Sequence, residues 1–159
     1  MSQTSTPQPD HPGVIGFPPL IFGLPWLAGL GLHLVFPEPV LPDRAAHVSG
    51  AGLIVLAVAL AVWGRRAMAR ADTDPNPMHP ATALVVDGPF RYSRNPLYVS
   101  LTVFYVGLAL ALNTLWPLVL LPFVAIVIER GVVEREERYL ERKFGEAYRE
   151  YRGRVRRWV

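Results

Sequence analysis

The chain has 159 residues, of which 51% are hydrophobic and only 18% are charged, and its mean hydropathy is +0.24. The apolar residues come in long blocks and cysteine is absent, which excludes an ordinary water-soluble domain, disulfides, thiolate metal sites and cysteine nucleophiles. The net charge is +3, and every basic residue except Arg44 lies in the regions 65–94 or 130–157, which beside apolar segments favours anionic lipid over nucleic acid as the partner.

Polar residues and prolines dominate residues 1–13, where we expect a disordered tail ahead of a single membrane-embedded domain over residues 14–159. Transmembrane helices are predicted at about 20–36, 45–64, 97–112 and 115–128. Gly50 and Gly52 in the second helix allow close approach of a neighbouring helix. The predicted fold class is all-α: a polytopic membrane protein with about four transmembrane helices and a C-terminal cytoplasmic or interfacial helical segment.

Four spans would put both ends of the chain on one side of the membrane. The loop from Arg65 to Arg94 and the tail after Glu129 are rich in arginine, whereas the Pro37–Arg44 loop has one arginine and the turn at Asn113 has none. The positive-inside rule therefore predicts that both arginine-rich regions face the cytoplasm, and we expect an integral protein of the cell (inner) membrane. Both termini, and any active site beside the arginine-rich regions, are expected on the cytoplasmic face.

A polar stretch from Gly88 to Tyr98 precedes the third predicted span. Gly88-Pro89 indicates a chain reversal, Asn95 suits a helix N-cap and Pro96 suits the first helical position. The free N–H groups and positive dipole end of such a helix start suit an anionic ligand group. The alternative is that the arginines and tyrosines of this stretch form only a positive-inside anchor with interfacial aromatic rings.

The last span continues as a charged helix predicted over residues 129–144, with a helix break at Gly145. Helical spacing from its apolar residues puts Glu136 and Glu137 on the apolar side. A carboxylate in that position is costly unless it meets a cation. Glu136 therefore either forms a salt bridge with an arginine such as Arg94 or binds the cation or hydroxyls of a ligand.

Two motifs on either side of the apolar hairpin resemble those of the isoprenylcysteine carboxyl methyltransferases and the related membrane phospholipid N-methyltransferases. The first motif is Gly88-Pro89-Phe90-x-x-x-Arg94-Asn95-Pro96-x-Tyr98, and the second is Glu136-Glu137-x-x-Leu140-x-x-x-Phe144-Gly145-x-x-Tyr148-x-x-Tyr151. The resemblance covers about the last half of the chain. It implies transfer of a methyl group from S-adenosylmethionine, which leaves S-adenosylhomocysteine, to a lipid or lipid-linked acceptor.

The resemblance also implies where the cofactor binds, within about residues 79–159. The implied cofactor-binding residues are Ala83, Leu84, Val85, Phe90, Asn95, Pro96, Leu97, Tyr98 and Glu136. The candidate catalytic residues are Arg94, Glu137 and Arg130. A carboxylate acceptor needs only a cation such as Arg94 or Arg130 to hold it, whereas Glu137 or Tyr98 can help an amine acceptor to lose its proton.

Two positions depart from the family pattern. Asn95 stands where many relatives have His, and Val132 stands where the eukaryotic prenylcysteine enzymes have an Arg associated with the substrate. The identity of the acceptor and the choice between O- and N-methylation therefore stay open. The alternatives are an NADPH-dependent sterol-type membrane reductase and a non-catalytic membrane subunit. The four histidines lack ligand-like spacing, so no metal site is expected.

Overall fold

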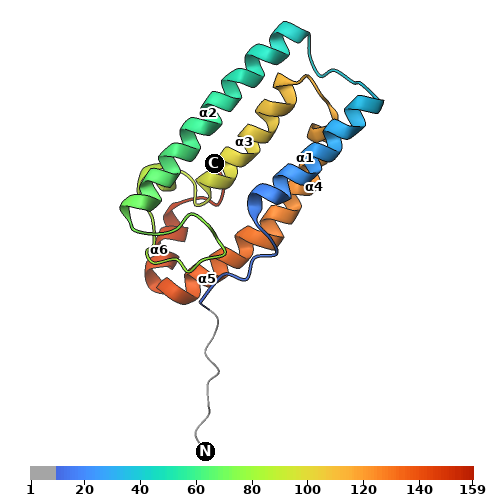
Figure 1. The fold of residues 1–159 in the computed structure, drawn as a ribbon. Coiled ribbons are helices and arrows are strands. Elements are labelled where there is room, and N and C mark those ends of the chain that lie inside the picture. Colours follow the sequence, from blue (N-terminus) through green and yellow to red (C-terminus); the bar gives the residue numbers. More distant parts are fainter. Residues whose placement is uncertain (1–9) are drawn as a thin grey trace, which may run out of the picture.

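The computed structural model describes residues 10–159. These form a bundle of long helices that lie side by side, with several short helices at one end of the bundle (Figure 1). The long helices are α1 (Pro18–Val35), α2 (Asp43–Arg70), α3 (Pro96–Ala111) and α4 (Trp116–Ile128). A 3-10 helix (Gly88–Arg91) precedes α3, and a π-helix (Glu129–Val133), α5 (Glu134–Phe144) and α6 (Glu146–Arg154) follow α4. The described residues contain no strand, and the predicted all-α class is confirmed.

Within the described chain, three helices are long and apolar enough to cross a membrane: α1, α2 and the continuous helix Trp116–Phe144. The apolar helix α3 has 16 residues, which at 1.5 Å per residue span about 24 Å. α2 packs along α3 and α1 packs along α4. Large apolar side chains such as Leu34 and Phe123 face outward from this bundle, as expected for an integral membrane protein.

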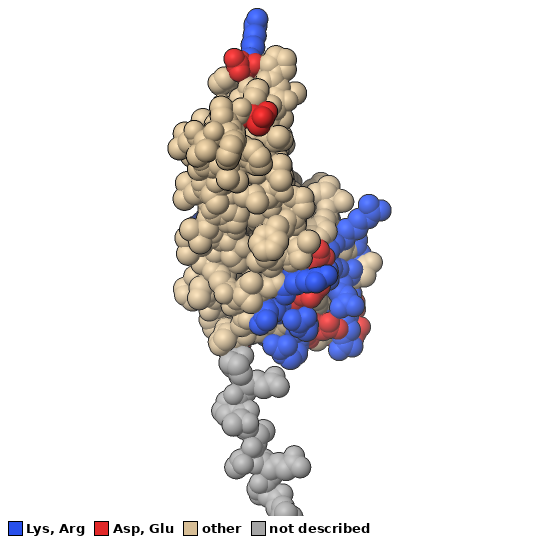
Figure 2. Space-filling model, turned by 90° about the vertical axis from the view of Figure 1, so that its right-hand side faces the viewer, with Lys and Arg blue, Asp and Glu red and all other residues tan. Residues whose placement is uncertain are grey.

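α2 is longer than predicted. We expected it to end near Gly64, but it continues through the arginines to Arg70. Arginine has a high helix propensity, so the helix can extend past the apolar layer into the polar surface. Figure 2 shows charged side chains gathered at one end of the molecule, while the body of the bundle is mostly uncharged.

The two arginine-rich regions meet at that charged end. The backbone N–H of Arg94 donates to the carbonyl of Arg156 at 2.9 Å, which joins the start of α3 to the C-terminal tail. At the opposite end the Asn113 side chain accepts hydrogen bonds from the backbone of Val40 and Leu41, at 2.9 and 3.2 Å. The even number of apolar helices therefore brings both arginine-rich regions to one side, as the sequence predicted.

An N-terminal arm, residues 10–17, lies against the charged helix. Of the predicted disordered tail, residues 1–9 lie outside the described residues, while residues 10–13 belong to this arm. The backbone N–H of Ile15 donates to the Gly131 carbonyl at 3.2 Å, and the Lys143 ammonium pairs with Asp10 at 2.7 Å. The arm thereby reaches the charged end of the molecule before α1 begins.

Small residues set the distance between the long helices. A Cβ atom on Gly50 would lie 2.3 Å from the amide nitrogen of Ala111 and 2.7 Å from the carbonyl oxygen of Gly107. α2 and α3 can therefore approach this closely only with glycine at position 50, as the sequence predicted. The prediction of a close helix contact at Gly52 is wrong, because a Cβ there would meet nothing within 4 Å.

Replacing Gly50 with Ala should destabilise the protein, because the added methyl group meets backbone atoms that cannot rotate away. We expect a loss of about 1–3 kcal/mol, seen as a lower thermal unfolding midpoint in detergent micelles. Gly52→Ala is the matched control, and its unfolding midpoint should not fall, because a Cβ there meets nothing within 4 Å and alanine favours a helix interior over glycine by about 1 kcal/mol. Equal shifts for the two variants would contradict the proposed close contact.

Candidate cofactor site

A cavity of about 480 Å³ opens at the charged end of the bundle. Its walls come from the start of α1, the end of α2, the loop between α2 and the 3-10 helix, the start of α3, and α5 and α6. The volume lies within the range of small-molecule sites in proteins. Segments far apart in the sequence therefore enclose one space at the end of the membrane-spanning helices.

Most of the residues expected to bind a cofactor line this cavity. Those that do are Ala83, Leu84, Val85, Phe90, Asn95, Leu97, Tyr98 and Glu136. Pro96 does not line it, because it is buried at the first position of α3. The start of α3 and the charged helix α5 thus face each other across one cavity, the arrangement on which the sequence-based hypothesis depends.

The Glu136 carboxylate faces the cavity with a neutral partner. Its Oε2 accepts a hydrogen bond from the Tyr98 hydroxyl at 2.9 Å. Within residues 10–159, Glu136 forms no ion pair. The Glu136 carboxyl group has oxygen lone pairs besides the one that the Tyr98 hydroxyl uses, so it can still bind the hydroxyl or ammonium groups of a ligand.

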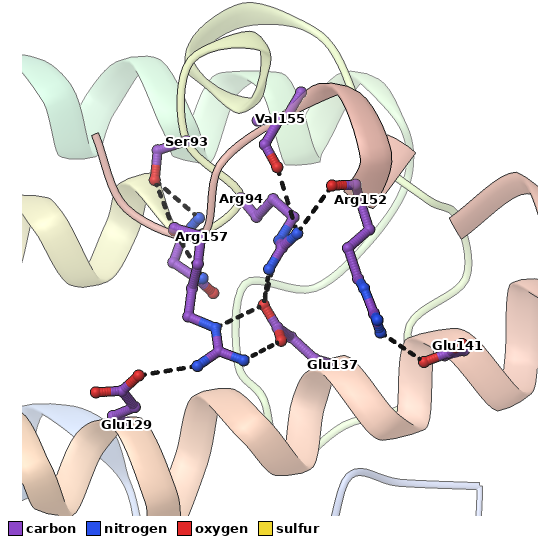
Figure 3. A network of polar contacts seen from close by, with 9 residues as sticks. Ser93, Arg94, Glu129, Glu137, Glu141, Arg152, Val155 and Arg157 are labelled. Carbon is purple, nitrogen blue, oxygen red and sulfur yellow. Dashed lines mark hydrogen bonds and ion pairs between the residues drawn. The ribbon is translucent and has the colours of Figure 1, made fainter. Parts of the chain in front are cut away.

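Glu137 forms the ion pair that the sequence analysis considered for Glu136. Its Oε1 lies 2.7 Å from the Arg94 guanidinium and its Oε2 lies 2.8 Å from that of Arg157 (Figure 3). Arg94 also donates to the carbonyl oxygens of Arg152 and Val155. The side chains of Arg94 and Glu137 are only 10% exposed. Both residues line the cavity, but their charges are engaged with each other and with the C-terminal tail.

Arg130, a predicted acceptor-holding residue, is not brought to the site. It lies on the π-helix, is exposed and is not among the residues that line the cavity. The regular α-helical period does not hold through a π turn, so the face on which Arg130 lies was not readable from the sequence. Of the three candidate catalytic residues, only Arg94 and Glu137 therefore border the cavity.

Two tyrosines of α6 complete the aromatic wall. Tyr148 and Tyr151 line the cavity, and the Tyr151 hydroxyl donates to the Phe90 carbonyl at 2.8 Å. Burial raises the pKa of Tyr148 to about 12, and burial also raises the pKa of Tyr151. Both hydroxyls therefore stay protonated at neutral pH. Both tyrosines belong to the second motif of the sequence, but they were not among the residues expected to bind the cofactor.

Other lining residues carried no sequence signal. They are Phe17, Pro18 and Pro19 at the start of α1 and Ala61, Arg65 and Met68 on α2. The loop before the 3-10 helix adds Asp74 and His79, and the His79 Nδ1 lies 2.7 Å from the Asp74 Oδ2. The α1 and α2 residues reach the site only through the packing of the long helices, whereas His79 begins the region, about residues 79–159, in which cofactor binding was expected.

Replacing Glu137 with Gln should destabilise the protein, because it leaves Arg94 and Arg157 without their shared counter-charge. We expect a loss of about 3 kcal/mol in unfolding free energy, measured by denaturant or thermal unfolding in micelles. Glu134→Gln is the control, since the Glu134–Arg138 pair is 3.8 Å long and more exposed. That control should change stability by less than about 1 kcal/mol, and a similar loss in both variants would argue against the network.

Comparisons with known proteins identify the family of the chain. A sequence profile described as phospholipid methyltransferase matches residues 45–147, which include the start of α3, Glu136 and Glu137. An uncharacterized protein of Haemophilus influenzae is 42% identical over 64 residues, which cover 40% of this chain and 100% of that relative. The chain belongs to the phospholipid methyltransferase family, and this membership implies an S-adenosylmethionine-dependent membrane methyltransferase.

Proposed function

We propose that this protein transfers a methyl group from S-adenosylmethionine to a lipophilic or lipid-linked acceptor, a carboxylate or an amine, at the cytoplasmic face of the cell membrane. The observation that carries the proposal is the single cavity between the start of α3 and α5, in which Glu136 has no cationic partner among the described residues. The excess of arginine at that end supports the cytoplasmic orientation.

The residues around the cavity suit the groups of this cofactor. The Phe90 ring can cover the face of an adenine, and the backbone near Leu84 can bind the adenine edge. The start of α3 at Asn95 carries the positive end of a helix dipole, which suits the methionyl carboxylate. Glu136 can accept hydrogen bonds from ribose hydroxyls or from the amino group.

The cofactor supplies an electrophilic methyl group on a sulfonium. The protein's task is to hold the acceptor in line with that methyl group and to keep water away from it. The aromatic wall and the apolar lining exclude water, while the Arg94–Glu137–Arg157 cluster keeps α3, α5 and the C-terminal tail in register. In this mechanism Arg94 and Glu137 position the site rather than contact the acceptor.

S-adenosylhomocysteine should raise the thermal unfolding midpoint of the purified protein, and NADPH should not. At one hundred times its dissociation constant a ligand stabilises by about 2.7 kcal/mol. A shift with NADPH alone would favour the reductase alternative, and no shift with either would favour a non-catalytic subunit.

Glu136→Gln should weaken the binding of S-adenosylhomocysteine, because the neutral amide accepts weaker hydrogen bonds than a carboxylate. Loss of a charge-assisted hydrogen bond corresponds to an affinity decrease of about tenfold or more. Glu134→Gln, on the same helix but not lining the cavity, should bind as the unmodified protein does. Titration by thermal shift measures both, and equal affinity in the two variants would remove Glu136 from the proposed site.

The methyl acceptor can be located directly. Membranes that contain the protein should, when given S-adenosylmethionine labelled in the methyl group, incorporate label into the lipid extract. Membranes with Glu136→Gln should incorporate much less. Label that appears only in water-soluble compounds would contradict a lipophilic acceptor.

A further inference from the structure

Among the described residues, three basic side chains line the cavity, and two of them are engaged. Arg94 pairs with Glu137 at 2.7 Å, and His79 pairs with Asp74 at 2.7 Å. The third is Arg65, for which the described residues provide neither an ion-pair partner nor a side-chain hydrogen bond. Arg65 is exposed and lies near enough to the Asp74 carboxylate to interact with its charge, but it forms no close ion pair with it. An anionic group that enters the cavity can therefore pair with Arg65.

One face of α2 borders the cavity. Ala61, Arg65 and Met68 line it, and their spacing of four and then three residues puts them on the same side of a helix. Arg66 has the same charge but does not line the cavity. Successive residues of a helix are about 100° apart around its axis, so Arg65 and Arg66 carry the same charge but lie on different sides of α2.

The wall at the start of α1 is apolar and continues to the outer surface. Phe17, Pro18 and Pro19 line the cavity, Phe17 is 42% exposed, and the next residue, Leu20, is 57% exposed. Since α2 packs on α3 while α1 packs mainly on α4, this wall and the Arg65 face belong to different helix pairs. A cation and an apolar wall that line the same cavity, with the wall continuing to the outer surface, fit an amphiphile with an anionic group and an apolar chain.

We propose that Arg65 binds the anionic group, a phosphodiester or a carboxylate, of the acceptor amphiphile, whose apolar chain lies against Phe17, Pro18 and Pro19. This inference rests on the proposed function, because the acceptor must reach the cavity that holds the methyl donor. Arg65 thereby takes the role of acceptor-holding cation that the sequence analysis gave to Arg94 or Arg130, because Arg94 is paired with Glu137 and Arg130 lies outside the cavity.

The test compares Arg65→Gln with Arg66→Gln in the full-length protein, purified in a neutral maltoside detergent. Hexadecyl phosphate and hexadecanoate are the probes, hexadecanol is the uncharged control, and inorganic phosphate is the control without a chain. Binding is measured as the rise in thermal unfolding midpoint with probe concentration. We expect Arg65→Gln to lose about tenfold in affinity for the anionic amphiphiles, and Arg66→Gln to stay within about twofold of the unmodified protein.

Several outcomes would overturn the proposal. Equal losses in the two variants would indicate general attraction at the surface, and equal binding of hexadecanol and hexadecyl phosphate would remove the need for a cation. Inorganic phosphate binding as tightly as the amphiphile would indicate a site for a free anion. If Arg65→Gln does not fold, Phe17→Ala tests the apolar half: it should weaken hexadecyl phosphate more than octyl phosphate, and equal effects on both would contradict the chain's position.

S-adenosylhomocysteine is titrated on the same samples to separate this proposal from the proposed function. Arg65→Gln should keep its response to S-adenosylhomocysteine while it loses the anionic amphiphiles. Loss of both responses would make Arg65 a cofactor residue and overturn its acceptor role. An unmodified protein that binds the amphiphiles but not S-adenosylhomocysteine would contradict the proposed function and leave the Arg65 site standing.

Discussion

The buried carboxylate of Glu137, held between the guanidinium groups of Arg94 and Arg157, is the interaction on which the site depends. It joins the start of α3 to α5 and to the C-terminal tail. The Arg157 guanidinium also pairs with Glu129 at 2.8 Å, so the cluster contains two positive and two negative charges. A balanced, hydrogen-bonded cluster can lie beside a membrane without an uncompensated charge. Removal of one member leaves an unpaired charge, which destabilises the protein.

The same cluster explains why two adjacent glutamates differ. Neighbouring residues of a helix point about 100° apart, so Glu137 meets the arginines while Glu136 faces the cavity and meets the Tyr98 hydroxyl. Because Arg94 is engaged by Glu137, Glu136 keeps its acceptor capacity for a ligand. One carboxylate thus stabilises the site, and the other is available to a bound molecule.

The two sides of the cavity have different origins in the chain. The lining residues from Ala83 to Glu136 lie within the part that matches the phospholipid methyltransferase family, and Tyr148 and Tyr151 follow just after it. The apolar wall from Phe17 to Pro19 lies before that part begins at residue 45. The side that we assign to the methyl donor therefore comes mainly from the part shared with the family, while a segment outside the match forms the wall that we assign to the acceptor.

The sequence by itself determined the class and position of the helices, the helix start at Asn95, and the inward face of Glu136 and Glu137, because hydropathy, capping and helical period are local properties. Only the tertiary structure decided which glutamate pairs with Arg94. It also decided that Gly50 rather than Gly52 meets a neighbouring helix, that Arg130 lies outside the cavity, and that Arg65 borders it. These outcomes depend on which surfaces of distant segments come into contact. The local pattern of residues does not specify how far apart such segments lie or how they are oriented toward each other.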